Sequence, residues 1–413
     1  MEFKKKSLYS PMFPNQWTPI KLYELAEWIN GKAFKKDDYN ITGLPVIKIA
    51  ELNTGLSSNT KYSINNDEKF YIKKGDILFA WSGNPDTSID THKFKEKEGY
   101  LNQHIFKVLP NDNKIESDFL YYILKYLKPF FKEIARNKQT TGLGHVTISD
   151  LKKIQVRIPS ENIQKEIADI FIILDSKIEI NNKIISNLES QAQAIFKSWF
   201  VDFEPFQDGN FVESELGMIP EGWEVKELGE IINLYDNKRV PISKMDRDKM
   251  EKNYPYYGAN GIIDYVDNYL FDGKYLLMGE DGTVRTEEGF PILNYVDEKF
   301  WVSNHAHIMR GTLVSTEYIY LLLSKMFINN IVTGAVQEKI NQRNLKKIKI
   351  IFPEKKELES FEKIIEPMFK MKLYLNNQNT KLAELRDALL PKLMAGEIDV
   401  SNIKIEGEEV KNE

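Results

Sequence analysis

Hydrophobic residues recur every three or four positions along two long segments of the chain. The first segment spans residues 160–204, where the series is Ile163, Ile167, Ile170, Leu174, Ile178, Ile185, Leu188, Ala192, Ile195 and Trp199. The second spans residues 354–400, where it is Leu358, Phe361, Ile365, Met368, Leu375, Leu382, Leu385 and Leu389. This spacing places one apolar stripe on a helix, and about 40 residues of helix measure about 60 Å.

A helix of this length with one apolar stripe needs a cover for it, so we expect the two helices to pair as an antiparallel coiled coil. Asn181 and Asn182 interrupt the first stripe, and Asn376 and Asn377 interrupt the second. We expect these buried polar groups to fix the register of the pair. The alternative is that each helix packs only on its own globular domain.

The segments 1–159 and 205–353 have a different pattern from the helices. Short β-rich runs such as LPVIKIAEL, DILFAW and FPILNYV are broken by Gly, Asn, Asp and Pro turns, which predicts a compact α/β domain in each segment. The predicted fold class is α+β: two tandem α/β domains joined by two long helices and related by a pseudo-twofold axis. The acidic tail, residues 401–413, is expected to be disordered.

The two globular segments are copies of one another. LKKIQVRIP ends the first and LKKIKIIFP ends the second, so that Leu345 lies 194 residues after Leu151. Trp223 lies 206 residues after Trp17, ILFAWSGN (Ile77–Asn84) matches LLMGEDGT (Leu276–Thr283), and we match His104 with His307. Loop insertions on a shared scaffold produce such a drift in spacing while the order of the motifs is kept.

The charge of the chain is unevenly distributed. The net charge of −5 argues against a polyanionic ligand, because nucleic acid is normally bound by a basic surface. However, Lys125–Arg157 and Lys325–Lys356 each carry eight Lys or Arg against two Asp or Glu. The two basic stretches recur at matching places in the copies, which favours a DNA contact over a merely solvated face.

Duplex DNA suits two related domains held apart by paired helices, because its backbone has twofold symmetry and its half-sites are spaced along the axis. The loops Asn137–Thr147 and Thr333–Asn344 are rich in side chains that can read bases. The predicted DNA contacts in the first copy are Trp81, Asn84, Lys138, Gln139, Thr140, Thr141, Gly144, His145, Lys152 and Lys153. Those in the second copy are Tyr257, Asn260, Gln337, Lys339, Asn341, Arg343 and Lys346.

Catalytic motifs are missing from the sequence. An adenine methyltransferase needs an Asp/Asn-Pro-Pro-aromatic motif, to which Asn84-Pro85-Asp86 is the nearest approach, and no GxxxxGK[ST] loop for ATP is present. The absence of cysteine excludes thiolate metal sites and fits a cytoplasmic protein. His305 and His307 have the spacing of metal ligands on a strand, but packing or DNA contact is favoured. The remaining alternative is a non-catalytic coiled-coil scaffold that does not bind DNA specifically.

The chain resembles the specificity subunit of Type I restriction–modification systems over nearly its whole length. The resemblance rests on LKKI…P at the end of each domain, on ENIQKEIADIFIILDSKIEINNKIISNLESQAQAIF, on KSWFVDFEPF and GMIPEGWE, on YYGANGII, and on LLPKLMAGEIDVS. It implies a non-catalytic, sequence-specific reader of double-stranded DNA, with one domain for each half of a bipartite site. The first domain departs from the pattern, since GLPVIKIAEL stands in place of YYGANG.

The resemblance also implies partners. Two modification subunits, which carry the S-adenosylmethionine-dependent adenine methyltransferase, would dock on the helices, and restriction subunits would join through them. No cofactor is expected on this chain, with S-adenosylmethionine and ATP bound by the partners, and no membrane is involved. The docking residues implied are Phe196, Trp199, Phe200, Leu389, Leu390 and Leu393.

Overall fold

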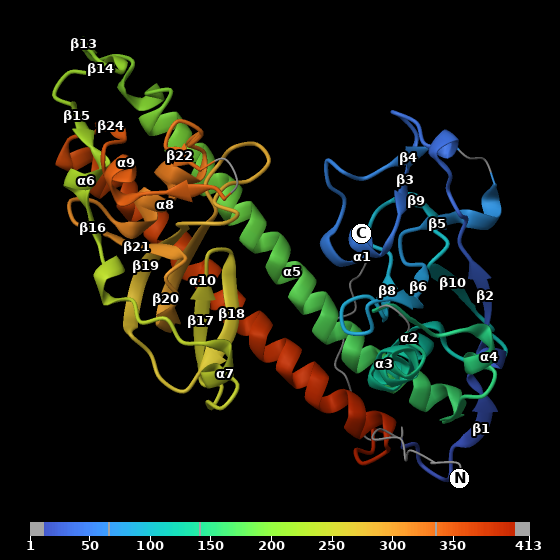
Figure 1. Cartoon of the computed structure of the whole chain (residues 1–413). Helices are drawn as coiled ribbons and strands as arrows, with labels where there is room; N and C mark the ends of the chain where they lie inside the picture. The colour runs from blue at the N-terminus through green and yellow to red at the C-terminus, as the bar shows by residue number, and fades with distance from the viewer. Residues whose placement is uncertain (1–11, 65–66, 140–141, 335–336, 401–413) are drawn as a thin grey trace, which may run out of the picture. The chain divides into compact units, whose positions relative to one another are not determined.

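The computed structural model describes residues 12–64, 67–139, 142–334 and 337–400. It divides into two compact units (Figure 1). Unit 1 is built from residues 1–179 and 380–413, and unit 2 from residues 180–379. Both boundaries fall inside the long helices α5 (Glu161–Phe200) and α10 (Lys355–Met394). Each unit therefore consists of one globular copy together with a section of both helices.

Unit 1 is organised around two four-stranded sheets, ordered β2-β10-β6-β8 and β4-β3-β9-β5. Two further strand pairs, β1-β12 and β7-β11, join segments that are far apart in the sequence. The strands are β1 Thr18–Lys21, β2 Ala26–Asn30, β3 Leu44–Ile47, β4 Tyr62–Ser63, β5 Tyr71–Lys73, β6 Ile77–Ala80, β7 Ser82–Gly83, β8 Asp90–Lys93, β9 Glu98–Leu101, β10 Ile105–Pro110, β11 Gly144–His145 and β12 Gln155–Ile158. The shorter helices are α1 Ile49–Thr54, α2 Ser117–Tyr126, α3 Lys128–Asn137 and α4 Ile148–Leu151.

Unit 2 contains one six-stranded sheet, ordered β16-β21-β19-β20-β17-β18, and the strand pairs β13-β14, β15-β24 and β22-β23. The strands are β13 Phe211–Ser214, β14 Gly217–Pro220, β15 Glu224–Glu227, β16 Ile232–Leu234, β17 Tyr254–Gly258, β18 Gly261–Val266, β19 Phe271–Gly279, β20 Leu293–Val302, β21 Ala306–Gly311, β22 Val332–Thr333, β23 Lys339–Ile340 and β24 Lys349–Phe352. The shorter helices are α6 Leu228–Ile231, α7 Lys244–Arg247, α8 Thr316–Ser324 and α9 Gln342–Lys346.

The backbone pairings of unit 1 recur in unit 2 at the positions that the sequence repeat matches. Thr18 pairs with Ile158 as Glu224 pairs with Phe352, which keeps the spacings of 206 and 194 found in the sequence. The parallel pair β3-β9 recurs as the parallel pair β17-β20. The predicted class, two tandem α/β copies with long helices, is therefore confirmed, and GLPVIKIAEL occupies the same strand position as YYGANG.

One match of the sequence repeat is wrong. The Trp81 N–H donates to the His104 carbonyl, and in unit 2 the Glu280 N–H donates to the carbonyl of His305. Phe106 pairs with Phe79 as His307 pairs with Met278. His104 therefore corresponds to His305, and Phe106 corresponds to His307, because the strand register, and not the identity of the residue, sets the correspondence.

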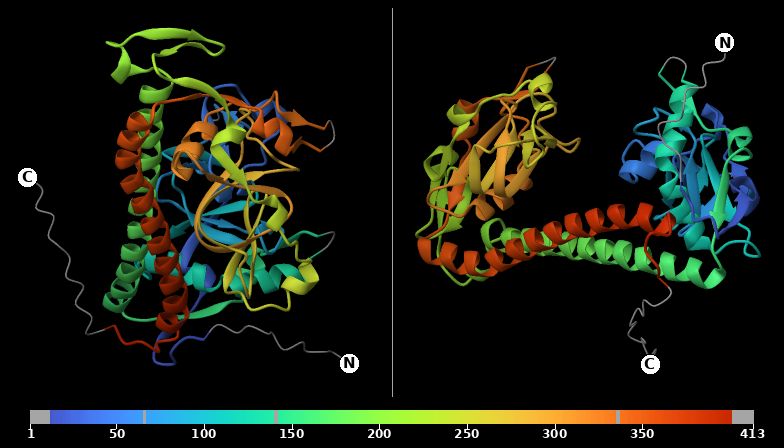
Figure 2. Two further views of the ribbon diagram at one scale, coloured as in Figure 1. Left: turned by 90° about the vertical axis from the view of Figure 1, so that its left-hand side faces the viewer. Right: turned by 90° about the horizontal axis from the view of Figure 1, so that it is seen from below.

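The long helices pack antiparallel in both units, as the contacts between them show (Figure 2). In unit 1, Asp175 of α5 pairs with Arg386 of α10 at 2.9 Å. In unit 2, Glu189 pairs with Lys372, so a later position on α5 meets an earlier position on α10. The antiparallel pairing predicted from the two apolar stripes is confirmed by these contacts.

A polar layer interrupts the helix pair within unit 2. The side chain of Asn181 is fully buried and donates to Gln378 Oε1 and Asn379 Oδ1, both at 2.8 Å. Asn379 donates in turn to Asn182 Oδ1 at 2.9 Å. A buried amide layer penalises a slipped register, as expected, but its partners on α10 are Gln378 and Asn379. Asn376 and Asn377, which were predicted for this role, lie on the exposed side.

Each unit has its own hydrophobic core, and both helices contribute to it. In unit 1, Phe171 of α5 and Leu393 of α10 belong to the cluster built around Phe79 and Phe119. In unit 2, Phe196 and Phe361 belong to the cluster around Tyr318 and Met309. Among the described residues, no helix is both long and apolar enough to cross a membrane.

Candidate nucleic-acid interface

In unit 1, the end of β6 is fixed by the indole of Trp81. Its ring stacks on Phe106 with 5.4 Å between centroids, and its Nε1–H donates to Asn30 Oδ1 at 3.0 Å. The Trp81 carbonyl accepts a hydrogen bond from the Val146 N–H at 2.8 Å. This half-buried residue joins β6 to the segment that follows α3, which carries most of the predicted base contacts.

That segment is anchored at its two ends. Gly144 lies against α3, where an added Cβ would be 2.3 Å from the Ala135 carbonyl oxygen, so only glycine permits the approach. Lys138 pairs with the carboxylate of Asp150, which also accepts from Thr147. Burial favours the neutral acid, yet these hydrogen bonds hold the pKa of Asp150 below its usual value. Lys138 is therefore bound within the chain rather than presented to a phosphate.

The remaining residues predicted in this segment differ in their surroundings. Gln139 is exposed, and its Nε2 donates to the Gly142 carbonyl at 2.7 Å. His145 is half-buried beside Ser82, its partner in the β7-β11 pair. Thr140 and Thr141 lie outside the described residues. Gln139 and His145 stay predictions for base contact.

Asn84 stands at an exposed turn after β7. Its Oδ1 accepts from the Asp86 N–H at 2.9 Å, and Asp86 is in turn paired with Arg136 of α3. Asn84 is exposed and directly follows Gly83, which pairs with Gly144. Asn84 therefore stays a prediction for DNA contact.

The basic residues before α5 fall into two groups. Lys152 and Lys153 are exposed, and the Lys152 ammonium lies 4.8 Å from the ring centre of Tyr23. Arg157 instead donates to the carbonyls of Asn15 and Trp17, at 2.8 and 3.1 Å. Arg157 therefore holds the start of the domain, whereas the two lysines keep the exposure that a phosphate contact requires.

In unit 2, the corresponding segment runs from Gln337 through α9. Lys339 is exposed and its Nζ lies 3.3 Å from Glu280 Oε1. Asn341 caps α9, accepting from the Asn344 N–H at 2.8 Å. Gln337, Arg343 and Lys346 are exposed. These residues, apart from the half-buried cap Asn341, present polar groups to solvent on one stretch of backbone.

The side chains that alternate with these residues turn inward. Ile340 is fully buried, and its carbonyl lies 2.8 Å from Nε2 of the buried His307. Gln342 donates to Asp236 Oδ2 at 2.6 Å, and His307 Nδ1 lies 2.6 Å from the same oxygen. Sequence reasoning missed this network, because Asp236 lies 71 residues from His307. His305 is exposed and pairs instead with Asp281 at 2.6 Å.

The hairpin β17-β18 places its two predicted contacts differently. Tyr257 is 7% exposed and donates to Glu298 Oε1 at 2.7 Å; burial and the adjacent carboxylate raise its pKa. The prediction of a DNA contact at Tyr257 is corrected by this burial. Asn260 lies exposed at the tip of the hairpin, between Gly258 and Gly261, and remains available.

The predicted docking residues belong mainly to the cores. Phe196 and Phe200 are 3% and 5% exposed inside unit 2, and Leu393 is 1% exposed inside unit 1. Trp199, Leu389 and Leu390 are half-buried and pack on the same cores. Helix–domain packing, rather than a free surface for a partner, accounts for their apolar character, and the expectation for the three buried residues is corrected accordingly.

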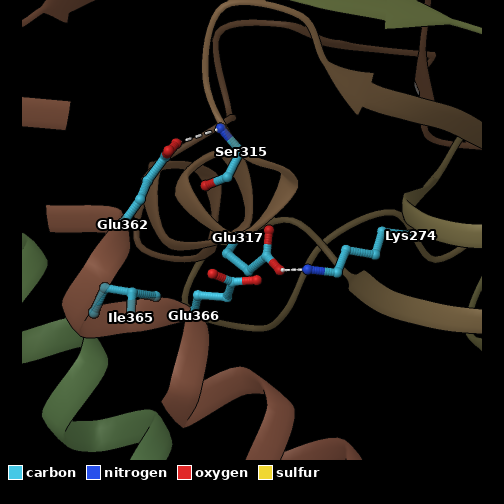
Figure 3. A pocket seen from close by; sticks show the side chains of 6 residues that line it. All are labelled: Lys274, Ser315, Glu317, Glu362, Ile365 and Glu366. Atoms are coloured by element: carbon cyan, nitrogen blue, oxygen red, sulfur yellow. Dashed lines mark hydrogen bonds and ion pairs between the residues drawn. The ribbon is translucent and has the colours of Figure 1, made fainter. Parts of the chain in front are cut away.

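A pocket in unit 2 is lined by residues of β19, α8 and α10 (Figure 3). Lys274 pairs with Glu317 at 2.7 Å, and Glu362 Oε1 accepts from the Ser315 N–H at 2.7 Å. The pocket also contains Glu366. Three carboxylates against one ammonium group repel phosphate, so this pocket does not belong to a nucleic-acid interface.

Comparison with known proteins agrees with the duplicated architecture. A family model described as the Type I restriction modification DNA specificity domain matches residues 14–190 and again residues 220–385. The chain is 28% identical over 324 residues to the Type I restriction enzyme MjaIX specificity subunit of Methanocaldococcus jannaschii, covering 73% of each protein. It is 25% identical over 437 residues to the MjaVIII specificity subunit of the same organism, covering 98% of this chain and 99% of that one.

A solved structure supports the fold independently. The S subunit of a Type I restriction–modification system from M. genitalium superposes with a TM-score of 0.55 at 17% sequence identity. The match covers 94% of this chain and 98% of that one. At this identity the likeness concerns the fold alone, which contains both copies and both long helices.

Proposed function

The chain belongs to the family of Type I restriction modification DNA specificity domains, and on this premise we propose that it is the non-catalytic subunit that selects the DNA sequence. Each unit would read one half of a bipartite site in double-stranded DNA. The observation that carries the proposal is the family match to both copies together with the recurrence of the same backbone contacts at matched positions.

We call the stretch that follows α3 in unit 1 and the stretch from Gln337 through α9 in unit 2 the reading segments. Their positions support the assignment of one half-site to each unit. His145 pairs with Ser82 in unit 1, and Lys339 forms a bridge with Asp281 in unit 2. His145 and Lys339 are 194 positions apart, which is the spacing of the LKKI motifs. A shared frame that carries different side chains at equivalent positions suits two half-sites of different sequence.

Within each segment we assign lysine and arginine to phosphates and amides to bases. Lys152, Lys153, Arg343 and Lys346 are exposed cations on or near short helices at the ends of the reading segments. Gln139 and Gln337 are exposed amides, and an amide can pair with the two polar groups on the major-groove edge of adenine.

We further propose that two modification subunits and the restriction subunits assemble on this chain. S-adenosylmethionine and ATP would bind to those partners, and work on intracellular DNA would place the complex in the cytoplasm. In unit 2, the long helices keep Ile180, Ile184, Met371 and Tyr374 exposed. Exposed apolar side chains on a helix pair are typical of a surface that a protein partner covers.

The test is the pattern of adenine methylation in cells that express the chain with modification subunits. We expect a single bipartite motif whose two parts are separated by unspecified bases. Omission of this chain is the control and should abolish the pattern. Methylation without a motif, or the same motif without this chain, would refute the assignment.

A further inference from the structure

Side chains at three equivalent positions contact one another beside the reading segment in both units. The residue types at these positions, and therefore the interactions between them, differ between the units. Unit 1 uses Asn30, Trp81 and Phe106, which form an amide–indole hydrogen bond and a ring stack. The strand register and the spacings of the repeat place Asp236, Glu280 and His307 at the same three positions of unit 2. In unit 1 the Trp81 carbonyl accepts a hydrogen bond from the Val146 N–H of the reading segment. In unit 2 the Glu280 carbonyl accepts one from the Ile340 N–H.

The hydrogen bonds of unit 2 define the protonation state of His307. Its Nε2 faces the Ile340 carbonyl, which can only accept, so Nε2 carries a proton. Asp236 accepts from the Ile308 N–H at 2.9 Å and from Gln342 at 2.6 Å, as an ionised carboxylate does. Burial alone would favour the neutral acid, but His307 and the Ile308 N–H lower the pKa of Asp236. Beside an ionised Asp236, Nδ1 donates as well, so this hydrogen-bond pattern is that of a ring with protons on both nitrogens.

Further charged groups of unit 2 surround this pair. Glu280 lies 3.8 Å from His307 Nδ1 and pairs with both Arg239 and Lys339. Arg239 also donates to the Ala306 carbonyl at 2.9 Å. Asp236, Glu280 and His307 have the composition of a metal site. However, an imidazole whose two nitrogens both donate protons has no lone pair for an ion, and Arg239 already supplies positive charge to Glu280.

We propose that His307 and Asp236 form a buried acid–base pair that positions the reading segment of unit 2. The pair makes recognition of one half-site dependent on the proton of His307. This inference rests on the proposed DNA-reading function and concerns positioning residues, since both side chains are buried and do not reach DNA. His307 contacts the Ile340 carbonyl, and Asp236 accepts a hydrogen bond from Gln342. These contacts orient the exposed neighbours Lys339 and Arg343. Unit 1 has no titratable side chain at the equivalent positions.

The experiment measures base discrimination at each half-site by the full complex with its modification subunits. Equilibrium binding is compared between the methylated motif found in cells and duplexes changed at one base in either half-site. Exchange of residues 223–353 for the domain of another specificity subunit assigns one half-site to unit 2. For the wild type, discrimination at that half-site should fall at least about tenfold as pH rises from about 6 to about 9. Discrimination at the other half-site should change with pH in the same way in the wild type and in His307→Gln.

His307→Gln should lower discrimination at the half-site of unit 2 about tenfold and remove its pH dependence, since glutamine does not titrate. His305→Gln is the matched control, because it alters a neighbouring exposed histidine outside the pair. Trp81→Phe, which loses the hydrogen bond to Asn30, should affect only the other half-site and without pH dependence. Amide exchange in β19 and β21 verifies that unit 2 of each variant is folded.

A wild-type complex with pH-independent discrimination at the half-site of unit 2 would overturn the inference, whatever the variants do. Equal losses at both half-sites in His307→Gln would also overturn it, because they indicate a general loss of structure. A wild-type complex without any bipartite motif would instead refute the proposed function itself.

Discussion

The clearest consequence for stability concerns His92, a half-buried residue of β8 in unit 1. It lies opposite Leu78 of β6, and its Nε2 has no hydrogen-bond partner among the described residues. Burial lowers the pKa of His92 from 6.5 to about 4, and the positive charges of Lys125 and Lys128 add to the effect, although Asp90 opposes it. His92 is therefore neutral in the folded unit 1 and protonates more readily in the unfolded chain.

The sign of the pH dependence follows from this difference. Below pH 6.5 the unfolded chain binds more protons than the folded unit 1. The contribution of the neutral His92 to the free energy of unfolding is therefore fully present above pH 6.5 and is lost as the pH drops toward 4. For pKa values of 6.5 and about 4, the loss is about 2 kcal/mol at pH 5 and about 3 kcal/mol at pH 4. Carboxylates elsewhere add their own acid sensitivity, so the quantity to compare is wild type against His92→Gln.

Amide hydrogen exchange followed by mass spectrometry measures the opening free energy of each unit separately. Between pH 7 and pH 5, peptides from β6 and β8 should lose about 2 kcal/mol more in the wild type than in His92→Gln. Peptides from unit 2 serve as the internal control and should not differ between the two proteins. An identical pH dependence of β6 and β8 in both proteins would show that His92 does not cause the acid sensitivity of unit 1.

Other substitutions test the packing and the interface. Gly144→Ala places a Cβ 2.3 Å from the Ala135 carbonyl oxygen, so it should weaken recognition of one half-site about tenfold while sparing the other, as binding to altered duplexes would show. Arg343→Ala should weaken binding to all sequences alike and lower the slope of log affinity against log salt by about 1; a sequence-dependent loss would reassign Arg343 to base reading. Phe361→Ala removes a fully buried ring of α10 from the core of unit 2, and it should cost about 3–5 kcal/mol in opening of unit 2; unchanged exchange there would contradict the packing described.

The duplication could be predicted from the sequence because its signals are local. The LKKI motifs begin at the ends of the short helices α4 and α9 and lead into β12 and β24, and their spacing is the same in the sequence and in the structure. The apolar stripes likewise predict α5 and α10, because helical periodicity is a property of neighbouring residues. Neither result depends on how distant segments meet.

What the sequence could not provide depends on contacts between distant segments. The match of His104 with His307 is wrong because loop lengths on either side of β21 set the register. Asn376 and Asn377 were expected in the polar layer, but the register of the helix pair brings Gln378 and Asn379 to Asn181. The apolar positions of each stripe are irregularly spaced. The sequence is therefore compatible with pairings of the two helices that differ by two or three residues.

Residue type was also a poor guide to exposure at the candidate interface. Aromatic and glycine turns are common both in binding loops and in hairpins, and Tyr257 turned out to be buried beside Glu298. Lysines predicted for phosphate contact include Lys138, which is held by Asp150 within the chain. Burial and internal ion pairs are properties of the folded surroundings, so the choice among polar loop residues required the structure.

We propose that two copies of one domain each read their own half of a bipartite site. This proposal is tested most directly by replacing residues 223–353 with the corresponding domain of another specificity subunit and mapping methylated adenines in cells that express the chimera with the modification subunits. We expect one half of the motif to change while the other half is retained. Retention of the complete original motif, or loss of both halves in a folded chimera, would contradict it.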